Sequence, residues 1–479
     1  MRWVCVMLCL IVCSSCSLAP RYHRPALYIP YTYKENVKWS RAKPHLTTLA
    51  RGPWWKMYHD PVLNQLEAQL HCDNQNIKIA LARFQQARAA LNVAKAAYFP
   101  TILAVGNAFR QQTSGNVANK VPAPLFSDNL LSLNLQYEID VWGRIRNQVL
   151  AARDVAKASA ADIATITLSM ETELASDYFM LRGDDAACHV LDQTVIAYQK
   201  ALDLTLRRFK GGVSPIADVD QAKNQLETAK TAAADMRLRR AQLEHAIANL
   251  IGKPPAMFSI LAKKYKPHLV TIAPDLPSTL LERRPDIASA ELLVQSANAN
   301  IGVARAAFFP AFNLSAGIGF ESSMLSNLLR MPSLVWSIGP TTSSALLNNG
   351  SMPLITQTVF DGGRISALTD DAYAKYVEHV AAYRQTVLTA YQEVEDSLVA
   401  LRQLDKEHHT QTAATRAANQ ALVQALYRYK GGLTTYLDVV VVQNIALQTE
   451  LNNIDIIARR QVASVQLIKA LGGGFTFVC

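Results

Sequence analysis

Two segments of the sequence carry a similar group of charged and turn-forming residues. The first, RRFKGGVSPIADVDQA, begins at residue 207, and the second, YRYKGGLTTYLDVVVVQ, begins at residue 427. Their glycine pairs, Gly211 with Gly212 and Gly431 with Gly432, lie 220 residues apart (431 − 211). Because glycine adopts the positive φ of a tight helix-ending turn, each segment predicts a turn between two helices.

An acid follows each glycine pair by six residues, Asp218 in the first segment and Asp438 in the second. Both acids are therefore expected near the start of the helix that follows the turn. A carboxylate at that end of a helix interacts favourably with the helix dipole. Helix capping alone thus accounts for the acids, and their position by itself does not establish a binding site.

The familiar catalytic and metal-binding motifs are missing from the sequence. There is no nucleophile elbow, no phosphate-binding glycine loop and no His-Glu-x-x-His helix. His408 and His409 are adjacent, and neighbours on a helix point about 100° apart, which suits chelation poorly. We therefore expect no enzyme activity, no cofactor and no metal site.

Composition limits the remaining classes. The 479 residues carry a formal net charge of +10, and half of them are apolar. The basic residues are scattered among acids without a dense block, which argues against nucleic acid as a partner. The body of the chain holds only Cys72, Cys188 and Cys479, too few for a disulfide framework. No segment after the first thirteen residues is apolar enough for a membrane-spanning helix.

The N-terminus has the layout of a secretory signal. Arg2 precedes an apolar run from Trp3 to Val12, which is too short to span a bilayer permanently. The run ends VCSSC, which resembles the end of a bacterial lipobox, although Cys13 stands where leucine is usual. This pattern predicts cleavage before Cys16 and attachment of a diacylglycerol to its thiol. An ordinary signal peptide with an incidental cysteine is the alternative.

The two halves of the chain repeat each other. AKAAYFP, ending at Pro100, recurs as ARAAFFP, ending at Pro310, an offset of 210 (310 − 100). WGRI at residue 142 recurs as GGRI at residue 362, an offset of 220 (362 − 142). The second half has therefore gained ten residues between Pro310 and Gly362. The chain is predicted to be two copies of one large unit.

Each copy is expected to run helix, strands, helix, turn and helix. From Asp60 to Phe99 the composition favours one helix, which Pro100 ends. From Gly143 to Phe209 there is one internal glycine and no proline. These 67 positions (209 − 143 + 1) predict a helix of roughly 100 Å.

Alternating segments precede the long helices. Apolar residues occupy alternate positions from Leu131 to Val141 and from Phe312 to Phe320, with polar or small residues between them. This period of two is typical of a transmembrane β-strand with one face toward lipid, and a half-buried strand of a soluble sandwich shows it as well. The fourth strand is predicted either at Leu354–Phe360 or at Leu334–Ile338.

Four strands in one chain cannot close a membrane barrel, because the smallest such barrels need about eight. An open sheet edge in lipid would leave backbone groups without hydrogen bonds, at several kcal/mol each. We therefore expect several copies of the chain to pool their strands around a shared lumen.

Several longer segments carry a family resemblance. They are YEIDVWGRIRN, LPSTLLERRPDIASAE, YRQTVLTAYQEVEDSL, LIKALGGGF and GPWWKMYHDPVLNQL. These segments resemble the signature segments of the TolC-like outer-membrane efflux proteins, in particular their lipoprotein branch. The resemblance covers nearly the whole mature chain, and the motifs occur in the family's order.

The resemblance implies a mixed α and β fold and a homotrimer. Four strands per chain would form a twelve-stranded β-barrel in the bacterial outer membrane, continued by a long periplasmic helical barrel with a mixed equatorial domain. The segment Tyr28–Trp54 and the proline-rich connection between the repeats would belong to that equatorial domain. The implied function is the exit duct of a tripartite efflux pump that exports small molecules. The implied partners are outer-membrane lipid, a periplasmic adaptor (membrane fusion) protein and an inner-membrane pump, commonly of the resistance-nodulation-division type.

The resemblance also assigns the two glycine turns. They would be the helix-hairpin tips, six per trimer, at the periplasmic mouth of the duct. The residues implied in the tip turns and in adaptor docking are Gly211, Gly212, Val213, Gly431, Gly432 and Leu433.

A periplasmic gate is implied beside the tips, formed by Asp218, Tyr429 and Asp438. The acids of the family ring the narrow end of the tunnel, and the tyrosine locks neighbouring helices. A ring of like charges favours cations and raises carboxylate pKa values. Thr434 stands where some relatives have a locking arginine, and Val441 where they have a second acid. These departures predict a looser and less cation-selective gate.

The expected domain plan follows the repeats. Its segments are a signal peptide (1–15), a lipidated N-terminal and equatorial segment (16–59), the first repeat (60–252), an inter-repeat connection (253–283), the second repeat (284–472) and a tail (473–479).

Two other functions stay open at this point. The chain could be the exit duct of a type I protein-secretion system, although a lipidated N-terminus and the RRPDI segment favour efflux. It could also be a periplasmic coiled-coil scaffold lipoprotein without a pore, although such a scaffold has no use for alternating strands.

Overall fold

The computed structural model describes residues 17–27, 30, 33–34, 52–114, 116, 118, 125–263, 283–339 and 355–473. The signal peptide, Cys16, most of the segment Tyr28–Trp54, most of the inter-repeat connection and Cys479 lie outside these residues. Cys72 and Cys188 are free thiols.

The chain divides into two compact units, and both repeats contribute to each. The sheet unit consists of Met1–Ala26, Phe84–Ser159 and Ala290–Tyr383. The tip unit consists of Leu27–Arg83, Ala160–Ser289 and Arg384–Cys479. The domain plan along the repeats stays a prediction.

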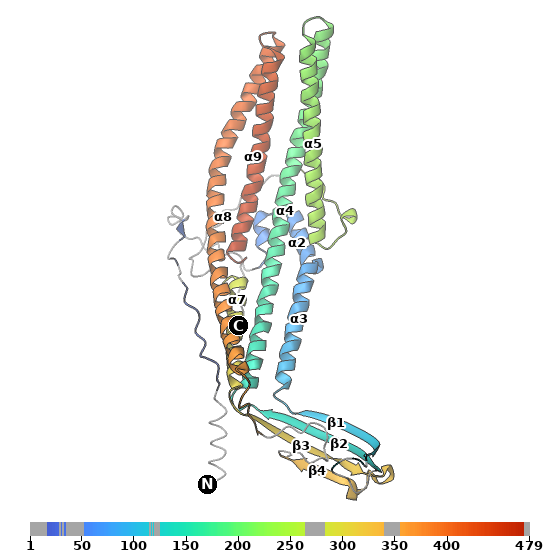
Figure 1. Ribbon diagram of the computed structural model, residues 1–479. Coiled ribbons are helices and arrows are strands. Elements are labelled where there is room, and N and C mark those ends of the chain that lie inside the picture. The colour runs from blue at the N-terminus through green and yellow to red at the C-terminus, as the bar shows by residue number, and fades with distance from the viewer. Residues whose placement is uncertain are drawn as a thin grey trace. The chain divides into compact units, whose positions relative to one another are not determined.

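The helices repeat with the offset expected from the sequence (Figure 1). Helices α4 (Arg144–Lys210) and α8 (Arg364–Lys430) each have 67 residues, and α5 (Ile216–Leu250) and α9 (Tyr436–Ala470) each have 35. The bounds of each pair differ by 220. Among the described helices, none is both long and apolar enough to cross a membrane.

The remaining helices are shorter. The first repeat begins with α2 (Pro61–Asp73) and α3 (Gln75–Ala96), and the second with α7 (Pro285–Ala306), which matches α3 at an offset of 210. The described residues also include the 3-10 helices η3 (Trp54–Tyr58), η4 (Pro255–Met257), η5 (Leu325–Asn327) and η6 (Met331–Ser333).

The prediction of one helix from Asp60 to Phe99 is wrong, because the helix is interrupted at Asn74. This residue is in the extended region (φ −60°, ψ 125°) and is buried. Its side-chain amide donates to the carbonyl of Leu250 (2.7 Å), and its oxygen accepts from the N–H of Ile77 (3.0 Å), which caps α3. A contact 176 residues away in the sequence thus ends one helix and starts the next.

The second repeat builds the same junction with a different residue. Arg284, which aligns with Asn74, donates to the carbonyl of Ala470 (3.0 Å) and pairs with Asp286 and Glu393 (2.6 Å each). Gly472 ends α9 at φ +86°, where a Cβ atom would lie 2.7 Å from the carbonyl oxygen of Arg283. Only glycine therefore allows this approach.

The strands form one antiparallel sheet in the order β1-β2-β3-β4. Strand β1 spans Thr101–Gln112, β2 spans Leu125–Ile139, β3 spans Ala311–Ser322 and β4 spans Leu334–Ile338. A further short strand, β5 (Ile355–Thr356), also pairs with β3.

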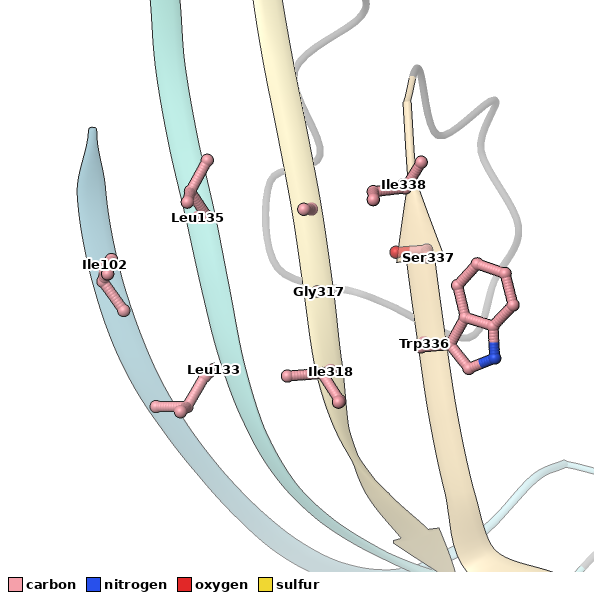
Figure 2. A pocket seen from close by; sticks show the side chains of 9 residues that line it. Ile102, Leu133, Leu135, Gly317, Ile318, Trp336, Ser337 and Ile338 are labelled. Atoms are coloured by element: carbon pink, nitrogen blue, oxygen red, sulfur yellow. The ribbon is translucent and has the colours of Figure 1, made fainter. Parts of the chain in front are cut away.

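The two faces of the sheet differ in polarity, as the alternation predicted. The apolar face carries rows such as Ile102–Leu135–Ala316–Ile338, in which each residue is opposite the next across neighbouring strands. Figure 2 shows side chains of this row and of the next one. The polar face carries Asn134, Ser132 and Gln136 of β2. Strand β1 is less regular, since Leu103, Val105 and Phe109 share the polar face.

The predicted fourth strand at Leu334–Ile338 is confirmed as β4, and the alternative position, Leu354–Phe360, contains the short strand β5. Continuing the register of β4 along β3 would place residue 343 opposite Ala311, but Ala311 pairs with Thr356, thirteen residues later (356 − 343). Thr356 is the counterpart, at an offset of 220, of Gln136, the partner of Thr101 in the first hairpin. The fourth strand is therefore split, and β5 keeps the register of the original duplication.

The hairpin lengths account for the net insertion of ten residues. In the first hairpin the outermost pair, Gln112 and Leu125, is 13 residues apart (125 − 112). In the register of β4, residue 332 is opposite Ser322, 10 residues away (332 − 322). A hairpin shortened by three residues and a segment between β4 and β5 lengthened by thirteen give a gain of ten.

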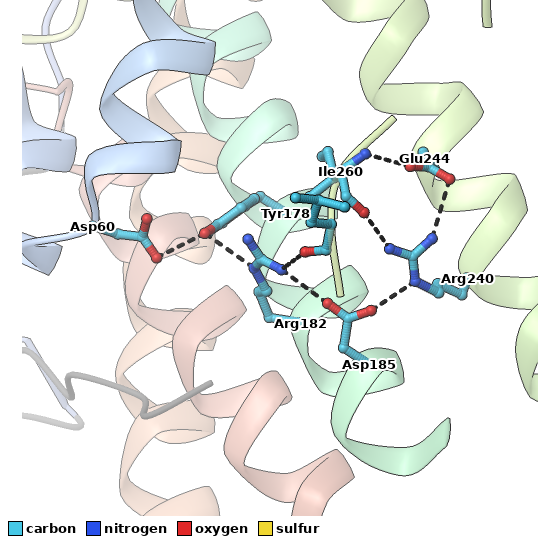
Figure 3. Close-up of polar contacts among 8 residues, drawn as sticks. Asp60, Tyr178, Arg182, Asp185, Arg240, Glu244 and Ile260 are labelled. Atoms are coloured by element: carbon cyan, nitrogen blue, oxygen red, sulfur yellow. Dashed lines mark hydrogen bonds and ion pairs between the residues drawn. The ribbon is translucent and has the colours of Figure 1, made fainter. Parts of the chain in front are cut away.

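Buried charges attach the inter-repeat connection to the tip unit (Figure 3). Arg182, which is 3% exposed, donates to Asp185 (2.9 Å) and to the carbonyl of Leu261 (2.9 Å). Arg240 donates to the other oxygen of Asp185 (2.6 Å) and to the carbonyl of Ile260 (2.5 Å). The connection is thus held between α4 and α5 by charge-assisted hydrogen bonds.

An N-terminal strap, residues 17–26, lies along α7 in the sheet unit. The hydroxyl of Ser17 donates to Asn147 (3.0 Å), and Asn298 donates to the carbonyl of Pro20 (2.8 Å). Arg24 pairs with Glu291 (2.8 Å). Because Asn147 lies in the first turn of α4, the strap begins where strand β2 gives way to that helix.

Candidate gate and docking turns at the helix tips

The two glycine turns have the same backbone. In the first, the N–H of Val213 donates to the carbonyl of Arg208 (2.9 Å) and that of Gly212 to Phe209 (2.9 Å). These are the two hydrogen bonds of a Schellman motif, which satisfies the last carbonyls of a helix. Gly212 is at φ +75°, and Gly432 in the second turn is at φ +76°.

The second turn repeats both hydrogen bonds. The N–H of Leu433 donates to Arg428 (2.9 Å) and that of Gly432 to Tyr429 (3.1 Å). The glycine turns predicted from the sequence are thus confirmed as helix ends. Val213 and Leu433, which follow them, are 70% and 74% exposed. Two apolar side chains are therefore available at the tips, and their role in docking stays a prediction.

Asp438 is used within its own chain to start α9. Its carboxylate accepts from the hydroxyl of Thr435 (2.8 Å) and from the N–H of Thr435 (3.2 Å), and the Thr435 hydroxyl accepts from the N–H of Asp438 (3.4 Å). This is a capping box. Thr434, the residue in place of a locking arginine, also donates to Asp438 (2.5 Å). Hydrogen bonds from Thr434 and Thr435 hold the pKa of this carboxyl below its usual range.

Asp218 is in a different local setting. Helix α5 follows Pro215, which offers no side-chain cap, and the N–H of Asp218 donates to the Pro215 carbonyl (3.2 Å). The side chain is half-buried and has no hydrogen-bond partner among the described residues. Its charge acts on the buried phenol of Tyr436: burial raises the pKa of Tyr436 to about 12, and Asp218 adds to that shift.

Tyr429 contacts both hairpins. The guanidinium of Arg208, at the end of α4, lies 4.6 Å from the centroid of the Tyr429 ring and donates to its carbonyl (3.2 Å). On the other side, the ring of Tyr436 lies 5.5 Å from that of Tyr429. Such a cation–π contact contributes about 0.5–2 kcal/mol. Tyr429 thus joins α4 to α8 and α9.

The hydroxyl groups of Tyr429 and Tyr436 are buried without a hydrogen-bond partner among the described residues. A buried hydroxyl without a partner costs about 1–3 kcal/mol. The two rings are held by an apolar cluster with Ala222, Val439 and Val440. The packing therefore fixes both rings and keeps their hydroxyls buried.

A second contact joins the hairpins below the tips. The side-chain amides of Gln225 in α5 and Asn444 in α9 are hydrogen-bonded to each other. Val441, at the position of a second acid in some relatives, is 50% exposed. The structure thus brings Asp218 into the electrostatic range of Tyr436, while Asp438 caps its own helix.

Sequence reasoning missed Arg208, Tyr436 and the Gln225–Asn444 pair. A signal was present for Tyr436, because it follows the turn that Tyr429 precedes and both are aromatic. Arg208 had no distinctive signal, since Arg207 and Lys210 are equally basic neighbours.

A family model for the outer membrane efflux protein family matches residues 66–253 and 276–473. The chain belongs to this family. The two matched ranges follow the two repeats, which supports the duplication read from the sequence.

Individual proteins agree with this assignment. The chain is 30% identical over 475 residues to the outer membrane protein OprJ of Pseudomonas aeruginosa, covering 98% of this chain and 96% of that protein. It is 27% identical over 466 residues to TtgC, a probable efflux pump outer membrane protein of Pseudomonas putida, covering 97% and 94%. The open state of the MtrE outer membrane channel of Neisseria gonorrhoeae is similar in structure, with a TM-score of 0.81, 27% identity, and 96% and 98% of the two chains covered.

The fold is therefore that of the TolC-like outer-membrane channels, with mixed α and β elements and four strand positions per chain. The function of the protein is efflux at the outer membrane. None of these three names describes a scaffold lipoprotein or a secretion duct.

Proposed function

We propose that three copies of this chain form the exit duct of a tripartite efflux pump. The observation that carries the proposal is the sheet, which has one apolar face and whose outer strands, β1 and β4, pair on one side only among the described residues. Open edges are not tolerated in lipid. Three copies supply twelve strand positions, and pairing β1 of one copy with the fourth strand of the next closes the barrel without an edge.

The mass of the purified mature protein in mild detergent tests the trimer. Light scattering with correction for bound detergent should give three chains, and planar bilayers should show discrete conductance steps. A folded monomer or dimer would contradict the proposal, as would a folded trimer that never conducts, even after the gate residues are replaced.

The tips are proposed to dock a periplasmic adaptor, which links the duct to an inner-membrane pump. The support is the pair of exposed apolar residues, Val213 and Leu433, on glycine turns whose backbone is fixed by hydrogen bonds. Changing both to aspartate should abolish efflux in cells while the purified trimer keeps its conductance. Loss of the trimer would show that the residues serve assembly instead.

The gate is proposed to consist of Asp218, Asp438 and Tyr429, with Arg208 holding Tyr429 in place. Support comes from the buried Tyr429–Tyr436 pair, the guanidinium on its face and the charge of Asp218 beside it. The Asp218→Ala/Asp438→Ala variant should give larger or less cation-selective steps than the parent protein. Unchanged steps would place the constriction elsewhere in the duct.

Lipidation at Cys16 is also proposed. Its support is the strap, in which Ser17, the next residue, is bonded to Asn147 at the junction of sheet and helix. If the apolar sheet spans the membrane, a lipid on Cys16 lies at the inner surface of that membrane. Mass spectrometry of the mature N-terminus should find acylated Cys16, and a free N-terminal residue or a different cleavage site would refute it.

A further inference from the structure

The loop that joins β3 to β4, residues 323–333, exposes apolar side chains. Its sequence is SMLSNLLRMPS. Met324 is 61% exposed, Leu325 72%, Leu329 70% and Met331 75%. Single exposed apolar side chains are ordinary, whereas four within eight residues indicate contact with an apolar medium or a partner.

The backbone of this β3–β4 loop is bonded within the loop. The N–H of Asn327 donates to Met324 (3.1 Å), that of Arg330 to Asn327 (3.1 Å) and that of Ser333 to Arg330 (2.9 Å). The hydroxyl of Ser333 also donates to the Asn327 carbonyl (2.9 Å). Polar backbone satisfied internally with apolar side chains outward is what an element in contact with lipid requires.

The register places the loop at the rim of the apolar face. The last pair of β3 and β4 is Phe320 with Leu334, and Phe320 is opposite Leu131 of β2. Beyond that row, the apolar face changes to Asn129 and Ser322. Strands β1 and β2 continue past this level, so the loop flanks the longer hairpin rather than standing beyond it.

The apolar face is short for a membrane. From Phe312 to Phe320 there are eight residue steps (320 − 312), or about 27 Å along the strand. A strand tilt of about 40° reduces this to about 20 Å across the membrane, whereas outer-membrane barrels have an apolar band of about 25 Å. About 5 Å of apolar contact is missing, and the loop follows directly on the last apolar row.

The other boundaries of the sheet are built differently. Exposed aromatic residues mark the end near the helices, including Phe99 (71%) and Phe308 (48%), as in the aromatic girdles of barrels. The matching loop between β1 and β2, residues 113–124, reads TSGNVANKVPAP and has no Leu, Met or aromatic residue. Of the two hairpin loops, only the β3–β4 loop therefore carries leucine and methionine in its sequence.

We propose that the β3–β4 loop lies in the outer leaflet of the outer membrane. Met324, Leu325, Leu329 and Met331 contact the acyl chains near the headgroups and extend the apolar face of the sheet, and the exposed Arg330 meets lipid phosphate. The inference rests on the proposed function, because it needs the sheet to span that membrane.

Spin labels at single cysteines test the inference. The mature trimer carrying Cys72→Ser, Cys188→Ser and Cys479→Ser is labelled at Leu329→Cys and reconstituted in vesicles of phosphatidylethanolamine and phosphatidylglycerol. Collision rates with oxygen, which concentrates in lipid, and with a water-soluble nickel chelate are compared. Ile338→Cys on the apolar face and Met257→Cys in η4 serve as the lipid and water references, since both positions are exposed in the chain.

The three labels separate the possible results. A ratio of oxygen to nickel collisions at 329 near that at 338, and several-fold above that at 257, supports the proposal. If the collision ratio at 338 is high, as expected in lipid, but the ratio at 329 is as low as that at 257, the loop inference is wrong. The proposed duct is not affected by that result. If the collision ratio at 338 is as low as that at 257, both the loop inference and the proposed duct are wrong, because the sheet would then not face lipid.

A second variant guards against disturbance by the label. Leu325→Asn/Leu329→Asn keeps the loop backbone and removes its two most central apolar contacts. With outward-facing loops in vesicles, trypsin should cut after Arg330 several-fold faster in this variant than in the parent. Equal cutting in parent and variant, with conductance intact in both, would show that lipid does not cover the loop.

Discussion

The two helix tips share a backbone and differ in how the next helix starts. Both turns are Schellman motifs with a glycine near φ +75°. In the second, Thr435 and Asp438 form a capping box, whereas in the first Pro215 precedes α5 and Asp218 does not cap it. The same acid at the same repeat position therefore caps its helix on one hairpin and makes no capping hydrogen bond on the other.

The junctions between the helices of each repeat show the same kind of divergence. Asn74 and Arg284 occupy equivalent positions and both donate to the carbonyl at the end of a long helix. Asn74 also caps α3, while Arg284 joins two carboxylates. Both repeats keep the hydrogen bond from this side chain to the carbonyl at the helix end. The other contacts of the side chain differ between the repeats.

Substitutions at these junctions should show the largest difference between the repeats in the free energy of unfolding. Arg284→Ala removes a buried guanidinium and three partners, and should lower the free energy of unfolding by about 2–3 kcal/mol. Asn74→Ala should cost about 1–2 kcal/mol, for one hydrogen bond and a cap. Chemical unfolding of the two variants in the same detergent measures both. An equal loss would mean that the ion pairs of Arg284 contribute nothing beyond the shared bond.

The next effect concerns the lock on Tyr429. Arg208→Ala should raise the open probability in single-channel records, because the cation–π contact and the bond to the Tyr429 carbonyl are both lost. Arg428 is the matched control, as it holds the same position in the second repeat (428 − 208 = 220) and is exposed. Arg428→Ala should change conduction less. If Arg428→Ala has the larger effect, the lock has been assigned to the wrong hairpin.

The two glycine turns should respond alike to substitution of their glycines by alanine. A Cβ atom at Gly212 or Gly432 would meet no other atom within 4 Å, so only the positive φ opposes alanine. Gly212→Ala and Gly432→Ala should each destabilise the local turn by about 1 kcal/mol. Hydrogen exchange of the turn amides measures this. Clearly unequal losses would contradict the shared backbone of the tips.

The smallest expected effect is a response to acid at α9 alone. The pKa of Asp438 is held below its ordinary value of 3.8, so its capping contribution is complete above that pH and is lost as the pH falls through the lowered pKa. Hydrogen exchange in the first turn of α9, corrected for the intrinsic rate, should speed up below about pH 4. The first turn of α5, in which Asp218 makes no capping hydrogen bond, is the comparison and should respond less. Asp438→Asn should remove the pH dependence, and a dependence that survives would assign it to another group.

Local sequence patterns predicted the features that depend on interactions between residues near in the sequence. The offset of 220, the 67-residue helices and the glycine turns follow from helix propensity and turn chemistry, and the polarity of the sheet faces follows from alternation. The break at Asn74 was missed because its cause is a carbonyl 176 residues away. Arg208 was missed because its partner is 221 residues away and its neighbours look the same in sequence.

The fourth strand could not be chosen from sequence because both candidates pair with β3. Leu334–Ile338 and Ile355–Thr356 lie along the same edge in registers that differ by thirteen residues. Strand patterns specify which face a residue takes, but the register depends on the partner strand.

The equal length of the two hairpins has a consequence for how many partners the tips can hold. Since α4 and α8 match in length, as do α5 and α9, the turns of one chain offer two copies of one backbone surface. In a trimer, a partner that recognises only this backbone meets six equal places. A partner that distinguishes Val213 from Leu433, or an uncapped helix start from a capped one, meets three places of each kind. If the tips dock the adaptor as proposed, side chains decide whether three or six copies of the adaptor bind, because the backbone of the tips would accept either number.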